Sequence, residues 1–261
     1  MAINGQDCAT SLLFKKGAEL EYKTFAPAGG LFSKGDFFEI TRLTFAVLDV
    51  KDSNNVRYSF IIKTGVNPKD DKQRYQKNYV ISCDGNKISI PFDFYTADTV
   101  YFSNVYPKVT RDKGIYSSTA YRGKCIYNFP VDFEKNKFEM TGSPVLMNMK
   151  VRDYEMGFTQ QNGSGGIRSA GPENTGRIVE NTYDIDISIK KSETKGKETV
   201  TVAGGTYECF KIVLTTDGEM FGRKINTNSV LFYNPEVGFV KSESQQAKSK
   251  SGYTELVRIK K

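Results

Sequence analysis

Apolar and polar side chains alternate with a period of two along most of this chain. In the clearest case, residues 183–190, one Tyr and three Ile residues alternate with two Asp, one Ser and one Lys. Successive side chains of a β-strand point to opposite faces, so this pattern predicts a half-buried strand. The same alternation recurs at Val56-Tyr58-Phe60-Ile62, Ile88-Ile90-Phe92-Phe94, Val145-Met147-Met149-Val151 and Phe210-Ile212-Leu214, and less cleanly at Tyr253-Glu255-Val257-Ile259.

Short turn-forming sequences lie between these segments, as is typical of antiparallel hairpins. No stretch of a dozen residues carries the 3.6-residue apolar stripe of an amphipathic helix. The sequence therefore predicts an all-β, antiparallel protein whose one or two sheets are strongly curved, like half-barrels. The predicted turns are Pro27-Ala28-Gly29-Gly30, Asn54-Asn55, Asp84-Gly85-Asn86, Lys195-Gly196, Gly204-Gly205, Asp217-Gly218 and Asn234-Pro235-Glu236-Val237-Gly238.

The 261 residues are enough for one or two domains, and no internal repeat divides them. We interpret residues 1–16 as the N-terminal segment of the mature chain and residues 17–261 as a single β domain, in which two lobes would meet near 126–130. Residues 157–177, rich in Gly, Ser, Asn and Gln, predict a long mobile loop. The longest uninterrupted apolar runs span four residues, so no transmembrane helix is predicted.

The chemistry available to the chain is limited by the absence of His. This excludes Ser-His-Asp and Cys-His nucleophilic catalysis and imidazole metal ligation. The net charge of +7 contains no run of five like charges, which favours a solvated surface over a nucleic-acid-binding face. We predict no catalytic residue, no metal ligand and no cofactor, and the sequence leaves any binding residues unknown.

Two pairs of carboxylates, Glu19 with Glu21 and Asp184 with Asp186, each lie two residues apart on one predicted strand face. That spacing is roughly 7 Å along a strand and is compatible with a glycosidase pair. Asp184 and Asp186, however, occupy the polar side of a sharply amphipathic strand. We therefore interpret them as part of a solvated face.

Four cysteines, Cys8, Cys83, Cys125 and Cys209, are far apart and form no CxxC motif. They are compatible with two disulfides, in any of three connectivities, or with four free buried thiols. Cys8 lies in a polar segment where a free thiol would be reactive, which favours a bridge involving Cys8. The 18 Phe and 15 Tyr residues predict either core packing or an apolar trough for a lipid or an extended peptide.

Several segments resemble the TapB family of exported bacterial proteins. Residues 202–212 (VAGGTYECFKI) are similar to the family's AGTFxCxKI strand, and residues 232–243 (FYNPEVGFVKSE) to its WYxxGVGxVKSE element. In this chain Gly205 is an extra residue, Phe232 replaces Trp, and Cys125 is additional, which leaves the disulfide pairing open. The remaining matching segments are Asp7–Thr10, Phe14–Tyr22 and Tyr79–Asn86.

The resemblance implies an exported, mainly β protein of the gram-negative envelope with no established activity. Residues 1–7 lack the features of a secretory signal, and we interpret them as the start of a mature chain; a cytosolic protein with a plain N-terminus is the alternative. We therefore expect a non-catalytic, periplasmic or outer-membrane-associated protein that binds a lipid, another apolar ligand or an envelope protein on a curved sheet. The alternatives are an assembly protein that recruits envelope components through a strand edge or loop, and a His-free carbohydrate-active enzyme.

Overall fold

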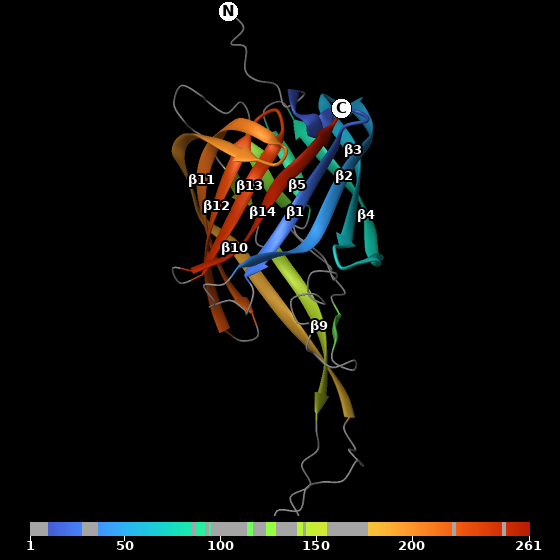
Figure 1. The fold of residues 1–261 in the computed structure, drawn as a ribbon, viewed down its shortest axis with the longest axis vertical. Helices are drawn as coiled ribbons and strands as arrows, with labels where there is room; N and C mark the ends of the chain where they lie inside the picture. Colours follow the sequence, from blue (N-terminus) through green and yellow to red (C-terminus); the bar gives the residue numbers. More distant parts are fainter. Residues whose placement is uncertain are drawn as a thin grey trace, which may run out of the picture.

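The computed structural model describes residues 10–27, 36–84, 87–91, 94, 114–116, 124–128, 140–142, 145–155, 177–220, 223–246 and 249–261. These residues form one short 3₁₀ helix and one antiparallel sheet of fourteen strands (Figure 1). The elements are η2 (Leu12–Phe14), β1 (Glu19–Pro27), β2 (Phe37–Ser53), β3 (Val56–Asn67), β4 (Asp70–Asp84), β5 (Lys87–Pro91), β6 (Gly114–Tyr116), β7 (Lys124–Asn128), β8 (Met140–Gly142), β9 (Val145–Glu155), β10 (Arg177–Val202), β11 (Gly205–Met220), β12 (Arg223–Asn234), β13 (Gly238–Gln246) and β14 (Ser249–Lys260).

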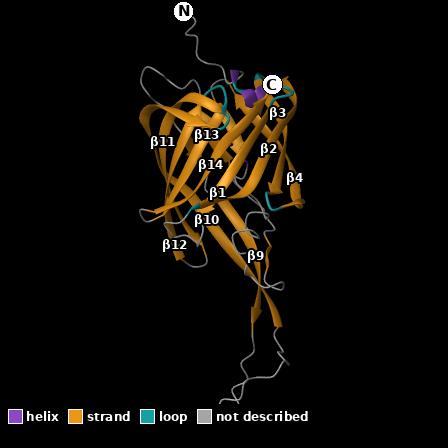
Figure 2. Ribbon diagram, in the orientation of Figure 1, coloured by secondary structure: helices purple, strands orange, loops and turns teal. Residues whose placement is uncertain are grey.

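The first and last strands of the chain meet in the middle of this sheet. The strand order is β6-β9-β10-β11-β12-β13-β14-β1-β2-β3-β4-β5-β7-β8, so β1 lies between β14 and β2 (Figure 2). Strands β2 to β5, β7 and β8 extend the sheet on one side of this junction, and strands β6 and β9 to β13 extend it on the other. The pairing of β1 with β14 thus joins an N-terminal and a C-terminal meander into one sheet.

The sheet curves strongly enough to bring its two ends together. Strands β8 and β9 lie near opposite ends of the strand order, yet only two residues separate them in the chain. Because consecutive Cα atoms are 3.8 Å apart, Gly142 and Val145 lie within about 11 Å of each other. Strand β8 also contacts β10. The prediction of an all-β, antiparallel and strongly curved fold is confirmed; among the described strands, β6 and β8 remain as open edges.

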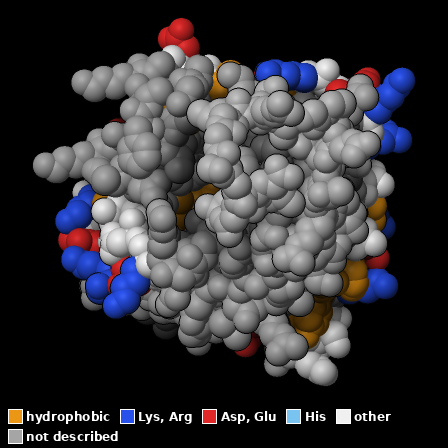
Figure 3. Space-filling model, turned by 90° about the horizontal axis from the view of Figure 1, so that it is seen from below, with side chains coloured by type: hydrophobic (Ala, Val, Ile, Leu, Met, Phe, Trp, Pro, Cys, Tyr) orange, Lys and Arg blue, Asp and Glu red, His pale blue; other side chains and the backbone are white. Residues whose placement is uncertain are grey.

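One apolar core lies on the inner side of the curve and takes side chains from both meanders. The N-terminal meander contributes Phe45 and Ile81, and the C-terminal one contributes Phe210 and Ile212, all at most 1% exposed. Helix η2 adds Leu12, Leu13 and Phe14, which belong to the same buried cluster. Figure 2 shows η2 at the same end of the molecule as the C-terminus. Seen from the opposite end, charged side chains lie around the margin of the molecule (Figure 3).

The register between β2 and β3 follows from a tight turn and a bulge. Asn54 and Asn55 have φ of 52° and 63°, the left-handed values that a two-residue hairpin turn requires. The β2–β3 register then shifts between Val47 and Asp49, so that Leu48 is the extra residue and stays half exposed. Beyond the bulge, Val47 pairs with Ile61 and Phe45 pairs with Lys63. These side chains are buried on the inner face.

Two of the predicted turns are wrong. Lys195-Gly196 lies inside β10, where the register shifts between Thr194 and Lys197 and Gly196 has φ of +112°. This is a bulge, which needs the same left-handed backbone as a turn. Asp217-Gly218 lies inside β11, where Gly218 pairs with Ile187 and Ile225. Residues 28–30 of the first predicted turn lie outside the described residues, and the hairpins at 54–55, 84–87 and 235–237 form as predicted. The turn predicted at Gly204-Gly205 forms one residue earlier, at 203–204.

The alternation predicted strands correctly but assigned the wrong inner face to two of them. In β3, Tyr58, Phe60 and Ile62 are only partly buried, and the inner face carries Ser59, Ile61 and Lys63 instead. In β14, a bulge at Val257 turns Leu256 inward, opposite Tyr22, and leaves Glu255 on the outer face opposite Lys23. A period of two fixes which residues share a face, whereas the register with neighbouring strands decides which face is buried.

Other expectations fall outside the described part of the chain. This holds for residues 1–9, for the predicted loop 157–177 except Arg177, which begins β10, and for Phe92 and residues 129–130. Strands form at 145–151 and 183–189 as predicted. Among the described residues, none of the helices is long and apolar enough to span a membrane.

We expect the Leu256→Ala substitution to lower the free energy of unfolding by about 2–5 kcal/mol, because Leu256 is fully buried at the junction of the two meanders. The Leu48→Ala substitution is the matched control, since Leu48 is 51% exposed; it should cost less than about 1 kcal/mol. Urea unfolding measures both. Equal losses for the two variants would contradict the described junction.

Candidate functional site

Two lysines converge on one tyrosine at the inner face of the sheet. Lys63 of β3 and Lys77 of β4 are register partners, so their side chains emerge side by side. Their Nζ atoms lie 5.6 and 5.2 Å from the centroid of the Tyr79 ring. Cations at such distances are attracted to the negative face of an aromatic ring. Lys63 is fully buried, whereas Lys77 is half buried. We call these two residues the inner-face lysine pair.

An aromatic cluster of Tyr22, Phe45, Tyr79 and Phe94 borders the lysine pair. Phe45 of β2 is the register partner of Lys63 on the side opposite Lys77. The Phe94 ring lies 4.6 Å from that of Phe45 and 5.3 Å from that of Tyr79, and the Tyr22 ring lies 5.5 Å from that of Phe45. Edge-on and tilted contacts of this kind stabilise aromatic packing. Cationic and aromatic side chains therefore adjoin on one wall of the interior.

Polar groups continue along the same inner wall. Thr41 of β2 and Ser59 of β3 are fully buried, and among the described residues neither hydroxyl has a hydrogen-bond partner. An unsatisfied buried hydroxyl costs about 1–3 kcal/mol. Thr41 lies four residues before Phe45 in β2, and Ser59 lies four residues before Lys63 in β3. Because the two strands are antiparallel, the hydroxyls lie on opposite sides of the Phe45–Lys63 pair. The inner wall thus offers charge, aromatic surface and hydrogen-bonding hydroxyls.

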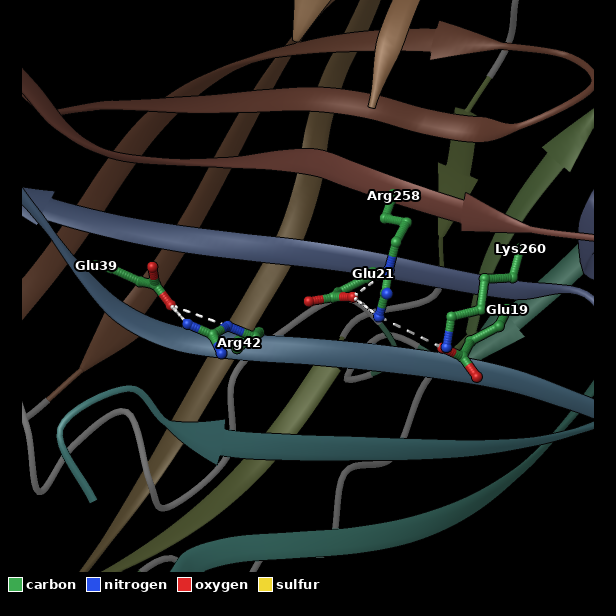
Figure 4. Close-up of polar contacts among 6 residues, drawn as sticks. All are labelled: Glu19, Glu21, Glu39, Arg42, Arg258 and Lys260. Carbon is green, nitrogen blue, oxygen red and sulfur yellow. Dashed lines mark hydrogen bonds and ion pairs between the residues drawn. The ribbon is translucent and has the colours of Figure 1, made fainter. Parts of the chain in front are cut away.

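The carboxylates Glu19 and Glu21 lie on the outer face of β1. Figure 4 shows them paired across strands: Lys260 Nζ lies 2.7 Å from Glu19 Oε1, and Arg258 Nε donates to Glu21 Oε2 at 2.8 Å. Each carboxylate is therefore held by a cation of β14 on a surface rather than beside another carboxylate in a cleft. Asp184 and Asp186 lie on β10, and the positions of their side chains are outside the described residues.

A third outer-face carboxylate, Glu39 of β2, is held by two cations. It accepts hydrogen bonds from Arg42 Nε and Nη2 at 3.2 and 2.9 Å (Figure 4). Lys23 Nζ lies 2.7 Å from its other carboxylate oxygen. Nearby, Phe25 and Tyr253 stack with ring centroids 4.6 Å apart. Solvent-exposed ion pairs contribute about 0–1 kcal/mol each. These contacts connect β14, β1 and β2, which makes their role structural.

The cysteines do not follow either of the predicted patterns. Cys83 is disulfide-bonded, while Cys209 is a free, buried thiol. Both the two-disulfide arrangement and the arrangement of four free thiols are therefore wrong. The side chains of Cys8 and Cys125 lie outside the described residues, so the bridge proposed for Cys8 stays a prediction. Burial, with smaller contributions from Glu198 and Glu208, raises the pKa of Cys209 to about 12.

Residues 202–212 form a hairpin whose turn packs on β14. The Gly204 N–H donates to the Leu256 carbonyl at 3.2 Å, and the Tyr207 hydroxyl donates back to the Gly204 carbonyl at 2.6 Å. A Cβ on Gly204 would lie 3.1 Å from Leu256 Cγ, and Gly205 has φ of +136°. A side chain at residue 204 would therefore crowd Leu256, and Gly205 has a backbone conformation that favours glycine. Cys209 and Phe210 are both buried, as expected for a strand covered on its two faces.

Residues 234–238 form the turn between β12 and β13 and anchor η2. Asn234 Oδ1 accepts from the N–H groups of Glu236 and Val237, each at 3.0 Å, and Gly238 has φ of +98°. The Leu12 N–H donates to the Glu236 carbonyl at 2.7 Å. The two segments that carry the family resemblance therefore form turns that hold β14 and η2 in place.

Sequence reasoning missed the inner-face lysine pair. Alternation placed Tyr58, Phe60 and Ile62 inside, which would put Lys63 in solvent. The only available signal was the Asn54-Asn55 turn, because a two-residue hairpin fixes the β2–β3 register. The bulge at Leu48 then changes that register, and nothing in the sequence marks it. Among the described residues, no group of three or more Cys, Asp or Glu side chains is arranged to hold a metal ion.

Comparison with known proteins links this chain to others of the same fold. Residues 131–256 match the model of the DUF3108-like family. A protein from Bacteroides fragilis, inferred to be exported and to have a YmcC-like fold, is similar with a TM-score of 0.59 and 16% identity over 95% of this chain and 97% of its own. A protein from Parabacteroides distasonis, inferred to be a lipoprotein, is similar with a TM-score of 0.58 and 16% identity over 95% of this chain and 96% of its own. No curated protein sequence matches.

We expect Cys209 to resist alkylation by iodoacetamide at pH 8 in the folded protein and to react after unfolding, as peptide mass mapping would show. The unfolded thiol ionises near 9.0 and the folded one near 12, so the unfolded state releases a proton first as the pH rises. Stability should therefore fall above about pH 9. This fall should be shallower in the Cys209→Ala variant. Rapid labelling of Cys209 in the native protein would contradict the buried, protonated thiol.

Proposed function

We propose that this protein is an exported, non-catalytic component of the bacterial cell envelope, and that it binds an apolar or amphiphilic ligand on the inner face of its curved sheet. The adjacency of the aromatic cluster and the inner-face lysine pair carries the proposal. Removing an ammonium group from water is costly, so a lysine buried among aromatic rings makes this wall unlike the apolar core around it. A ligand site gives such a residue a use.

Three further observations support export and the absence of catalysis. Disulfides persist in oxidising compartments, and Cys83 is disulfide-bonded. The two similar structures are of proteins inferred to be exported or a lipoprotein. The chain has no His, and the described carboxylates Glu19, Glu21 and Glu39 are held by cations on the outer face. A periplasmic or outer-membrane-associated location fits these features.

A second candidate function is recruitment of another envelope component through a strand edge. Strand β10 pairs with β9 from Arg177 onward, but its pairing with β11 begins only at Asp186. Among the described strands, residues 177–185 of β10 therefore have one unpaired edge, and this part of the β9–β10 ribbon extends away from the rest of the sheet (Figure 1). Unpaired strand edges accept an added strand.

We expect the protein to retain an apolar ligand when it is isolated gently from the envelope, detectable by native mass spectrometry and by extraction into organic solvent. The Tyr79→Leu substitution removes a ring of the aromatic cluster and should reduce ligand occupancy several-fold. The Val80→Leu substitution is the matched control, since Val80 lies next in the chain on the outer face and is 52% exposed.

Two results would contradict the proposal. An empty wild-type protein, together with an envelope complex that is lost when residues 177–185 are altered, would favour the strand-edge function. Turnover of a polysaccharide that disappears in the Glu21→Gln variant would show that the protein is an enzyme.

A further inference from the structure

The disulfide partner of Cys83 follows from where the other cysteines lie along the chain and in the sheet. Cys83 is disulfide-bonded, lies next to the last residue of β4 and is only 4% exposed. Of the three remaining cysteines, Cys209 is ruled out because its thiol is free. The partner is therefore either Cys125 of β7 or Cys8, which precedes η2.

The register of the sheet excludes Cys125. Strand β5 lies between β4 and β7, so Cys83 and Cys125 are not on neighbouring strands. Cys83 pairs with Ile88, whereas Cys125 pairs with Ile90, two residues further along β5. With neighbouring strands about 4.8 Å apart and about 3.4 Å per residue, the two Cα atoms are roughly 11–12 Å apart. A disulfide requires Cα atoms about 4.4–6.8 Å apart, so these two cysteines cannot be bridged.

Helix η2 lies at the end of the sheet where Cys83 is found. Cys83 pairs with Arg57, the second residue of β3. Helix η2 contacts β2 and β3, belongs to the same buried cluster as Cys83, and is followed by Lys16, which forms an ion pair with Asp49 near the same hairpin. Cys8 is four residues before the helix begins, and four residues span at most roughly 14 Å. The chain leading into η2 can therefore reach Cys83.

We propose that Cys8 and Cys83 form the disulfide, and that residues 8–14 are thereby a covalent clasp across the two meanders. On the C-terminal side, the Leu12 N–H donates to the Glu236 carbonyl at 2.7 Å, in the turn between β12 and β13. On the N-terminal side, the disulfide fixes the same segment to β4. Helix η2 is thus held against the shared core from both sides. This inference is independent of the proposed ligand binding.

The clasp depends on the redox state of the compartment. Formation of the bond removes two protons and two electrons from the two thiols, and a disulfide oxidant of the envelope accepts both as it is reduced to a dithiol. The bond closes a loop that contains β1, β2 and β3. Such a cross-link stabilises the folded state mainly by restricting the unfolded chain. The clasp is therefore complete in the exported protein and open in a reducing compartment.

Peptide mass mapping without reduction tests the pairing, because trypsin places the four cysteines in four different peptides. Free thiols are first blocked with N-ethylmaleimide in denaturant at mildly acidic pH, where disulfide exchange is slow. We expect the peptides of Cys8 and Cys83 to be joined, and those of Cys125 and Cys209 to carry the maleimide. The four peptides are residues 1–15, 78–87, 125–135 and 198–211.

Three results of the mapping would overturn the pairing. They are a link between the peptides of Cys83 and Cys125, a blocked thiol at Cys83, and a link between two copies of the chain.

Urea unfolding tests whether the bond acts as a clasp. Reductant should lower the midpoint of the wild-type protein by roughly 1 M, as expected when a long loop loses its cross-link. The Cys8→Ser variant should begin at that lower midpoint and not respond to reductant. Cys125→Ser is the matched control and should keep the full response. A wild-type midpoint that ignores reductant would overturn the clasp, and a Cys8→Ser variant that responds to it would assign the bond to another pair.

Hydrogen exchange measured by NMR tests the anchoring of η2. The Leu12 amide should exchange at least about tenfold faster after reduction, because only its hydrogen bond and apolar packing then hold the segment. Unchanged exchange at Leu12 would overturn the anchoring of η2 by the disulfide.

Discussion

The structure depends on the antiparallel pairing of the first and last strands of the chain. Glu19 to Phe25 of β1 pair with Lys260 to Tyr253 of β14, and β1 also pairs with β2 along its whole length. Without this junction the N-terminal and C-terminal meanders would be separate sheets, each with a half-exposed apolar face. With it, Leu20, Tyr22 and Leu256 complete a core that both meanders share. The Gly204 hairpin and η2 pack against the same region.

The junction also separates two kinds of electrostatic environment. On its outer face, charges of opposite sign pair in water, where each pair contributes little but none is costly. On the inner wall, two and three strands from β1, the side chains of Lys63 and Lys77 lie among aromatic rings. There an ammonium group is expensive to bury and strongly attracts anions. The same sheet therefore carries paired charges on its outer face and two lysines among aromatic rings on its inner wall.

The sequence was sufficient to predict the fold class and most of the strands, because alternation with period two reports strand structure directly. It was insufficient for the inner wall. In β3, apolar residues occur on both faces, and only the register with Val47 and Tyr79 selects Ile61 as the inner one. Bulges at Leu48 and Val257 depend on contacts across strands. Gly196 and Gly218 lie in turn-like sequences, but the long pairing of β10 with β11 keeps both residues within strands.

Our central claim is that the β1–β14 junction makes the two meanders one cooperative unit, and native-state hydrogen exchange followed by mass spectrometry tests it most directly. If the claim is correct, the most protected amides of β2 and β3 and those of β11 and β12 will exchange with the same free energy and the same dependence on denaturant, since both require global unfolding. Exchange of one meander at a clearly lower free energy, while the other stays protected, would contradict the claim.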